Sequence, residues 1–173
     1  MISCRVCGNQ LEKFMSFGKM PIANRFLLPK QFDSEYFFEL APAFCKSCFT
    51  FQIIEQPSPE KMFHNNYAFY SSTSRYMQLH FKEFAYEVIN SILMGRDEPF
   101  VVEIGSNDGI MLRHFKDKGC RHLGIEPSEN VLSDDSEIEI HNGFLDPSKQ
   151  MGEPYDLIYS IAVFEHIESI GVI

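Results

Sequence analysis

The sequence predicts an α/β protein made of two parts, a small N-terminal domain held by four cysteines and part of a Rossmann-like, doubly wound domain. Two C-x-x-C pairs lie within the first 48 residues. From residue 99 onward, apolar strand-like runs alternate with helix-like stretches, which indicates parallel strands with right-handed crossovers. The first of these runs, FVVEIG, leads into a glycine-containing turn of the kind that binds adenosine-bearing cofactors.

Length, composition and charge argue against some classes of binding partner. The chain has 173 residues, which suits one domain or two small ones, and a net charge of -9, which argues against a sequence-independent grip on nucleic acid. No apolar run approaches the roughly 20 residues that a membrane span needs. The N-terminus, MISCRVCGNQ, has no signal-peptide pattern, so we predict a cytoplasmic protein with no membrane partner. In that compartment, cysteines are metal ligands or free thiols rather than disulfides.

The four paired cysteines predict a structural zinc site. Cys4 and Cys7 form one C-x-x-C, Cys45 and Cys48 form the other, and Gly8 suits the tight turn after the first pair. Four thiolates complete a tetrahedral zinc site with no open position. The 37 residues between the pairs exceed a zinc-ribbon gap, so a small subdomain is expected between them, within a domain of residues 1–56. The alternatives are two unrelated pairs or a redox dithiol, and the latter lacks its thioredoxin-like context.

Residues 57–96 are predicted to form a substrate segment and a linker helix. The run FTFQIIEQ predicts a strand before them, and PSPE ends it and starts a short helix near residues 61–64. The next stretch, NNYAFYSSTS, is rich in hydroxyls and aromatic rings. An apolar stripe then predicts a helix with Ser74 as its N-cap and Gly95 just past its end. Cys120, further along, has no partner in the sequence and is predicted to be a packed, inert thiol.

Residues 97–173 are predicted to form a partial sheet in strand order 3-2-1-4. The expected strands are FVVEIG, RHLGIEP, EIEIHNGF and YDLIYSIAVF, with the helix IMLRHFKDKG after the first. The fourth strand would then be an apolar edge, and such edges invite association. We therefore expect self-association through this edge or a missing C-terminal portion that covers it.

The turn after the first strand favours S-adenosylmethionine as the cofactor. Gly105 fits the first position of the dinucleotide motif G-x-G-x-x-G, but Asn107 and Ile110 occupy the other two. An open turn of this kind suits a cofactor with an amino-acid tail, with a nucleotide or no ligand as the alternatives. Glu126 ends the second strand and is placed to accept the ribose hydroxyls, while Glu103 lies near the amino-acid portion.

Ligands of open α/β sheets bind at the carboxyl ends of the strands. The predicted cofactor-binding residues lie at these strand ends and in the loops that follow. They are Glu103, Gly105, Ser106, Asn107, Gly109, Glu126, Pro127, Phe144 and Ala162.

Several motifs along the chain point to one family. They are CRVCG with the second C-x-x-C, the stretch NYAFYSSTS, the turn VEIGSNDGIMLR, the strand end HLGIEPS and the stretch AVFEHI. Together they resemble the S-adenosylmethionine-dependent C-methyltransferases that act on nucleotide-linked keto-sugars. The resemblance covers essentially the whole chain and implies a nucleotide-sugar substrate.

The resemblance also implies a reaction and the residues that perform it. A base removes the proton beside the ketone, and the resulting enolate takes the methyl group of the cofactor. The resemblance implies catalytic roles for Tyr67, Tyr70 and His166, and substrate contacts for Ser71, Ser72 and Arg75. Each has a simpler alternative: the tyrosines can pack the linker, the serines can cap the following helix, and the histidine can be structural.

Two departures from the family pattern favour a second hypothesis. The second tyrosine of the family's Y-x-Y-x-S-S segment is Phe69 here, and the sequence ends at Ile173, before the family's remaining strands and a downstream histidine base. The alternative is therefore a non-catalytic, zinc-dependent module that binds cofactor or nucleotide sugar. A nucleic-acid-binding zinc ribbon fails because the chain is acidic and has few basic residues around the cysteines.

Overall fold

The computed structural model describes residues 2–132, 136–146, 148 and 154–167. These residues fall into two compact units, one of the residues up to Phe63 with those from His166 onward, and one of His64–Glu165. The predicted α/β class is confirmed, with a cysteine cluster in the first unit and a parallel sheet in the second. The predicted boundaries at residues 56/57 and 96/97 stay a prediction. Among the described residues, no helix has both the length and the apolar character needed to cross a bilayer.

The first unit consists of short antiparallel strands in two sheets. One sheet has the order β1-β4-β5 and the other pairs β2 with β3. Residues 17–32, within the subdomain expected between the two cysteine pairs, contain a strand and most of a 3-10 helix. The elements are β1 (Glu12–Lys13), β2 (Lys19–Pro21), η1 (Pro29–Ser34), β3 (Phe37–Glu39), β4 (Pro42–Phe44), β5 (Phe51–Ile53) and α1 (Pro59–Met62).

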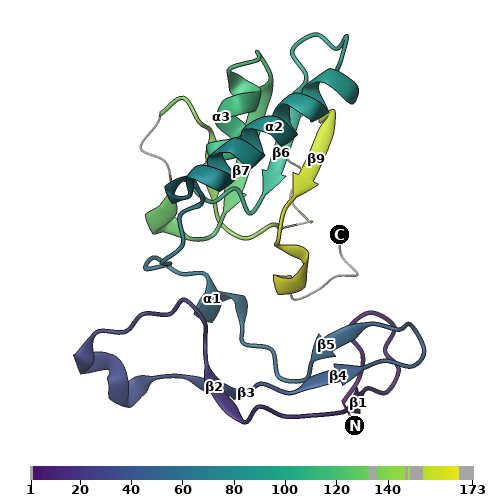
Figure 1. Cartoon of the computed structure of the whole chain (residues 1–173), viewed down its shortest axis with the longest axis vertical. Helices are drawn as coiled ribbons and strands as arrows, with labels where there is room; N and C mark the ends of the chain where they lie inside the picture. Colours follow the sequence, from purple (N-terminus) through teal and green to yellow (C-terminus); the bar gives the residue numbers. More distant parts are fainter. Residues whose placement is uncertain (1, 133–135, 147, 149–153, 168–173) are drawn as a thin grey trace. The chain divides into compact units, whose positions relative to one another are not determined.

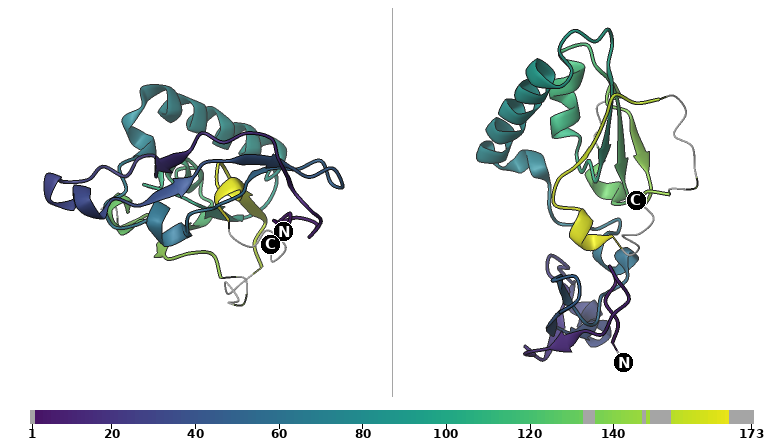
Figure 2. Two further views of the ribbon diagram at one scale, coloured as in Figure 1. Left: turned by 90° about the horizontal axis from the view of Figure 1, so that it is seen from below. Right: turned by 90° about the vertical axis from the view of Figure 1, so that its right-hand side faces the viewer.

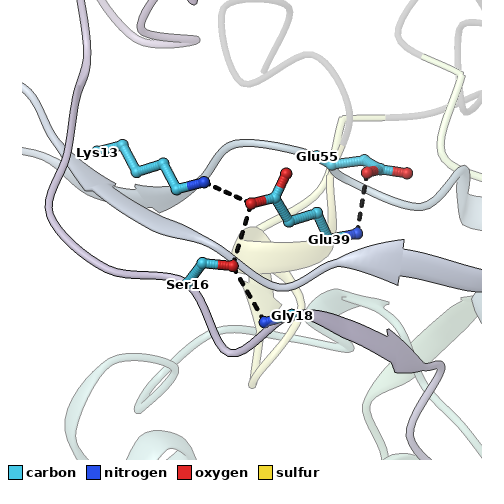
Figure 3. Close-up of polar contacts among 5 residues, drawn as sticks. All are labelled: Lys13, Ser16, Gly18, Glu39 and Glu55. Carbon is cyan, nitrogen blue, oxygen red and sulfur yellow. Dashed lines mark hydrogen bonds and ion pairs between the residues drawn. The ribbon is translucent and has the colours of Figure 1, made fainter.

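Polar contacts connect the two sheets of the first unit (Figure 3). The Glu39 carboxylate, at the end of β3, accepts hydrogen bonds from Lys13 Nζ of β1 and, at 3.0 Å, from Ser16 Oγ. The hydrogen bond from Lys13 holds the pKa of Glu39 below its ordinary value. Glu55, just after β5, accepts the backbone N–H of Glu39 at 2.9 Å. The apolar core of this unit is small, so these contacts supplement it.

The second unit is built on a four-stranded parallel sheet. β6 (Phe100–Ile104) lies between β7 (Arg121–Glu126) and β9 (Leu157–Ser160), and β8 (Ile140–Asn142) pairs with β7. The order β8-β7-β6-β9 confirms the predicted order 3-2-1-4. In the described part of the chain, β9 forms an edge of this sheet, as predicted.

Helices α2 (Arg75–Ser91) and α3 (Ile110–Lys116) pack against one face of this sheet (Figures 1 and 2). Phe81 and Val88 of α2 meet Val101 of β6 and Phe115 of α3 in one core. Cys120 belongs to the same core, and burial raises the pKa of its thiol, as expected of a packed, inert cysteine. The 3-10 helices η2 (Ser71–Thr73), η3 (Glu129–Val131) and η4 (Phe164–His166) lie in the connections.

Some elements are shorter than the sequence pattern predicts, for local reasons. β9 begins after Asp156, whose carboxylate accepts the backbone N–H of Phe100 at 2.8 Å, and it ends before Ala162, whose φ of 55° turns the chain. α3 ends at Lys116, and Gly119, with φ of 81°, donates its N–H to the Lys116 carbonyl at 2.8 Å. The apolar pattern of the sequence continues past these residues, but the regular strand or helix conformation of the backbone ends there.

We expect Ser74 to contribute the cap of α2. Its Oγ accepts the N–H of Met77 at 3.4 Å, whereas Ser72 bonds Asp108 and Gln78 through its backbone N–H and carbonyl. Ser74→Ala should lower the free energy of unfolding by about 1 kcal/mol, and Ser74→Asp should restore it. Ser72→Ala is the matched control and should change it by less than about 0.5 kcal/mol in urea unfolding. Equal losses in the two alanine variants would contradict this assignment.

Candidate functional site

The first candidate site is the predicted zinc centre. The Sγ atoms of Cys4, Cys7, Cys45 and Cys48 all lie within 4.8 Å of one another. Cys4 Sγ is 3.6 Å from Cys48 Sγ, and Cys7 Sγ is 3.5 Å from Cys45 Sγ. Zinc–sulfur bonds of about 2.3 Å in a tetrahedron would place the sulfurs about 3.8 Å apart. The four thiols therefore fit a tetrahedral zinc ion with no open position.

Side-chain amide donors contact two of these sulfurs, those of Cys4 and Cys7. Gln52 Nε2 donates to Cys4 Sγ at 3.2 Å, and Asn9 Nδ2 donates to Cys7 Sγ at 3.4 Å. Burial opposes ionisation of Cys4, but backbone N–H groups of Cys7 and Val6, with Gln52 and the neighbouring Cys48, lower the pKa of its thiol to about 6. Outer contacts of this kind orient metal ligands and raise affinity.

The two C-x-x-C turns share one backbone shape. The residue after each pair donates its N–H to the carbonyl of the first cysteine, Gly8 to Cys4 at 2.9 Å and Phe49 to Cys45 at 2.8 Å. Both residues are left-handed, with φ of 75° and 61°. The predicted turn glycine at position 8 thus has a phenylalanine counterpart, which the sequence pattern did not indicate.

The second candidate site lies at the carboxyl ends of β6 and β7. Gly105, Asn107 and Gly109 all have positive φ, at 76°, 49° and 69°. The N–H groups of Gly105 and Ser106 both donate to the Ile125 carbonyl, at 2.8 and 3.2 Å. The turn is therefore fastened to the end of β7, where the predicted ribose-binding acid follows.

Glu126 is buried and holds two loops at once. Its Oε2 accepts the backbone N–H of Asn107 at 2.9 Å, and its Oε1 accepts that of Ser128 at 2.8 Å. A carboxylate has about four acceptor positions, so two remain for a pair of vicinal hydroxyls. This donor and acceptor set fits the ribose diol of an adenosine cofactor.

Glu103 lies on the same strand end and is fully enclosed. Burial raises its carboxyl pKa to about 8, the Tyr159 phenol offsets part of this shift, and the carboxylates of Asp108 and Glu126 add to it. Tyr159 is the cross-strand neighbour of Glu103, and burial and Glu103 raise the pKa of its phenol. A cationic group placed beside Glu103 would favour its ionised form.

Several buried oxygens near these strand ends have no hydrogen-bond partner among the described residues. Buried polar groups are normally paired, so such a group points to a ligand or to water. They fit a polar cofactor tail that reaches the ends of β6, β7 and β9. The atoms are Glu103 Oε2, Ser106 Oγ, Asp108 Oδ1, Ser128 Oγ, Tyr159 Oη and Ser160 Oγ.

The remaining predicted cofactor residues lie in loops of the same unit. Pro127 follows β7 and is half-buried, while Phe144 and Ala162 are exposed, after β8 and β9. The left-handed Ala162 precedes Val163, whose Cγ2 would overlap a Cβ placed on Gly105. Glycine is therefore required at 105 both by its φ and by this close approach.

The predicted substrate segment lies against the cofactor turn. Ser71 donates its N–H to Asn107 Oδ1 at 2.8 Å, and Ser72 donates its own to Asp108 Oδ2 at 2.9 Å. Tyr67 is half-buried, and burial, with a smaller contribution from Glu126, raises the pKa of its phenol. The structure thus brings the segment and the turn together.

The other predicted substrate and catalytic residues are placed less specifically. The Tyr70 hydroxyl donates to the Asn130 carbonyl at 3.0 Å. Arg75 is exposed at the first residue of α2. His166 ends η4 in the first unit, and its ring meets that of Phe63 edge-on, with centroids 5.4 Å apart. The predicted roles of these residues stay predictions.

Two residues of this site did not enter the sequence-based list. Asp108 lies in the turn itself and binds the segment through Ser72. Asn130 lies in η3 and hydrogen-bonds Tyr67 through its side-chain amide. Asp108 could have been found by its place between Asn107 and Gly109, whereas nothing in the sequence marks Asn130.

A parallel sheet with a buried acid at the end of its second strand, in a chain that also carries a four-cysteine cluster, is the combination expected of a methyltransferase with an added zinc-binding domain. Residues 75–172 match the family described as a methyltransferase domain, and residues 4–63 match the family described as a putative zinc binding domain. The chain belongs to this methyltransferase family. The cofactor is accordingly S-adenosylmethionine, and the metal is zinc.

Comparison with two known proteins gives the extent of the similarity in numbers. The chain is 29% identical to the C-methyltransferase NovU of Streptomyces niveus over 180 residues, which cover 96% of this chain and 41% of that protein. The chain thus spans less than half the length of this relative. The solved structure of DesVI from Streptomyces venezuelae aligns with a TM-score of 0.38 at 18% identity, over 49% of this chain and 36% of that one.

We expect the first unit to depend on zinc for its fold. Structural zinc contributes about 10–16 kcal/mol of apparent binding free energy in small domains, and the apolar core here is too small to replace it. Cys45→Ser should therefore reduce the zinc content, measured by atomic emission, from about one ion per chain to near zero. Cys120→Ser removes the cysteine outside the cluster and is the matched control. Full zinc content in Cys45→Ser would contradict the four-thiolate site.

We also expect Glu103 to make stability fall as pH rises. Its carboxyl pKa is about 8 in the folded state and 4.5 as its ordinary value, so between these values the folded chain keeps a proton that the unfolded chain releases. This group alone then lowers the free energy of unfolding by up to about 1.4 kcal/mol per pH unit in that window.

Glu103→Gln keeps the shape of the neutral acid and should remove this slope. The measurement is urea unfolding of the zinc-saturated proteins between about pH 5 and pH 8, taken as the difference between wild type and variant so that shared titrations cancel. Parallel stability curves in the two proteins would rule out a buried, protonated Glu103.

Proposed function

We propose that this chain is the zinc-binding and cofactor-binding part of a C-methyltransferase that methylates a nucleotide-linked keto-sugar. The observation that carries the proposal is the contact, through Ser71 and Asn107, between the hydroxyl-rich segment and the turn after β6, which is itself hydrogen-bonded to Glu126. It supports the proposal because a segment that could bind the acceptor then lies close to the carboxylate proposed to bind the ribose. The 29% identity to a C-methyltransferase over 96% of the chain supports the same activity. The cytoplasm stays the predicted location.

Glu126 would bind the ribose hydroxyls with the acceptor positions that Asn107 and Ser128 leave open. Glu103 would lie near the amino-acid portion of the cofactor, whose positive charge favours an ionised carboxylate there. When bound, S-adenosylmethionine supplies an electrophilic methyl group. The carboxyls of Glu103, Asp108 and Glu126 make this edge acidic, which suits a cationic cofactor better than a pyrophosphate.

The acceptor chemistry follows from the ketone. A base of the protein would take the proton from the carbon beside the carbonyl and so make that carbon nucleophilic toward the methyl group that bound S-adenosylmethionine would supply. Tyr67, Tyr70 and His166 are the proposed acid–base groups, and Ser71, Ser72 and Arg75 the proposed sugar and phosphate contacts. Of these, Tyr67 is half-buried, and burial, with a smaller contribution from Glu126, raises the pKa of its phenol, which suits a proton donor better than a base.

A zinc-dependent binding module without catalysis is the second candidate. Phe69 supports it, because a phenylalanine stands where the family segment carries a tyrosine. Phe69 is 47% exposed, and its carbonyl, rather than its ring, contacts the turn by accepting from Asn107 Nδ2 at 3.1 Å. Transfer of a labelled methyl group from S-adenosylmethionine to nucleotide-sugar ketones separates the two candidates.

Titration calorimetry with S-adenosylhomocysteine tests the cofactor site first. Wild type should bind it saturably and should not bind NADH. Glu126→Ala should weaken binding by about 100-fold or more, because two hydrogen bonds to a charged acceptor are lost. Glu129→Ala removes an exposed acid three residues away and is the matched control. Unchanged affinity in Glu126→Ala would refute the assigned ribose contact.

A further inference from the structure

Two asparagine side chains hold the backbone of the substrate segment, here residues 67–73. Asn107 accepts the N–H of Ser71 with its Oδ1 at 2.8 Å and donates its Nδ2 to the Phe69 carbonyl at 3.1 Å. A side-chain amide carries the same donor and acceptor as a peptide group. Asn107 therefore pairs with the segment as a neighbouring strand would.

Asn130 repeats this contact four residues earlier in the segment. Its Oδ1 accepts the Tyr67 N–H at 2.9 Å, and its Nδ2 donates to the Tyr67 carbonyl at 2.7 Å. The same Nδ2 lies 3.0 Å from the Tyr70 hydroxyl, which donates in turn to the Asn130 carbonyl. Both amides thus bind main-chain groups, which leaves the side chains of Ser71 and Ser72 available for an acceptor.

Glu126 contacts the backbone of the two loops that carry these asparagines. The Asn107 N–H donates to Glu126 Oε2, and the N–H of Ser128, two residues before Asn130, donates to Glu126 Oε1. The proposed ribose-binding carboxylate is therefore bonded to Asn107 itself and reaches Asn130 only through the short loop from Ser128. A ligand that orders this carboxylate also orders both loops.

We propose that Asn107 and Asn130 are positioning residues that clamp the substrate segment over the cofactor edge and couple cofactor binding to the order of that segment. The inference rests on the proposed function for the identity of the cofactor. Since linkage is reciprocal, an acceptor that orders the segment also tightens cofactor binding by the same factor.

The test is residue-resolved amide exchange by NMR on the zinc-loaded chain. In Asn130→Ala, the Tyr67 amide should exchange about tenfold faster than in wild type, while the Ser71 amide changes far less. In Asn107→Gly, which keeps the left-handed backbone of that position, the Ser71 amide should exchange faster, while the Tyr67 amide changes far less. Asn90→Ala, at an exposed position of α2, is the matched control and should change neither amide. If a substitution instead destabilised the whole unit, exchange would become faster at both amides and also at the amides of β6.

The conservative variant Asn130→Asp adds a second readout. It keeps the oxygen that accepts the Tyr67 N–H but loses the donor to the Tyr67 carbonyl. Tyr67 amide protection should therefore return in part. If Asn130→Ala does not fold, this variant alone should still show faster exchange at Tyr67 than wild type. Wild-type exchange at Tyr67 in every Asn130 variant would overturn the clamp.

Saturating S-adenosylhomocysteine tests the coupling. It should slow exchange of the Tyr67 and Ser71 amides in wild type, and in Asn130→Ala it should bind yet fail to slow Tyr67. Binding that leaves segment exchange unchanged in wild type would overturn the coupling. Absence of binding in wild type would instead refute the proposed function, and the ligand-free exchange would still decide the clamp.

Discussion

The buried carboxylate of Glu126 is the contact on which the arrangement of the cofactor edge depends. A buried carboxylate is costly unless hydrogen bonds satisfy it, and two backbone N–H groups do so here, from the turn after β6 and from the loop after β7. These two loops carry the asparagines that hold the substrate segment. One acidic side chain thus fixes the turn, the loop and, through them, the segment. The same oxygens retain the acceptor positions that a ribose needs.

The first unit solves a different physical problem. Its core consists of a few buried apolar side chains, which is too little to offset the conformational entropy of so many short strands. A bound metal ion supplies the missing stability. The four ligands come together only in the folded unit, so the free energy of metal binding adds to the free energy of folding. Hydrogen bonds from Gln52 and Asn9 to the sulfurs, and the Glu39 contacts between the two sheets, order the parts that the metal does not reach.

The sequence predicted the features that rest on periodicity and on strict spacing. The strand order, the core face of α2, its Ser74 cap, and the four cysteines follow from such patterns. Of the antiparallel strands of the first unit, β5 lies within the predicted strand FTFQIIEQ, whereas β1 to β4 were not predicted, because strands of two or three residues have no measurable period. The early ends of β9 and α3 were not predicted either, because they depend on backbone turns at Ala162 and before Gly119 rather than on the hydrophobic pattern.

Asn130 shows why part of a site is invisible in sequence. An asparagine that binds main-chain atoms needs no particular partner residue, so no pattern links it to Tyr67, 63 positions away. Its position is set by the length of the turn after Glu126 and by η3, both of which follow from tertiary contacts. The tyrosines and serines of the segment were recognisable because the stretch resembles the Y-x-Y-x-S-S segment of the family. The residues that orient them act through geometry alone, and they could be assigned only once the loops were placed.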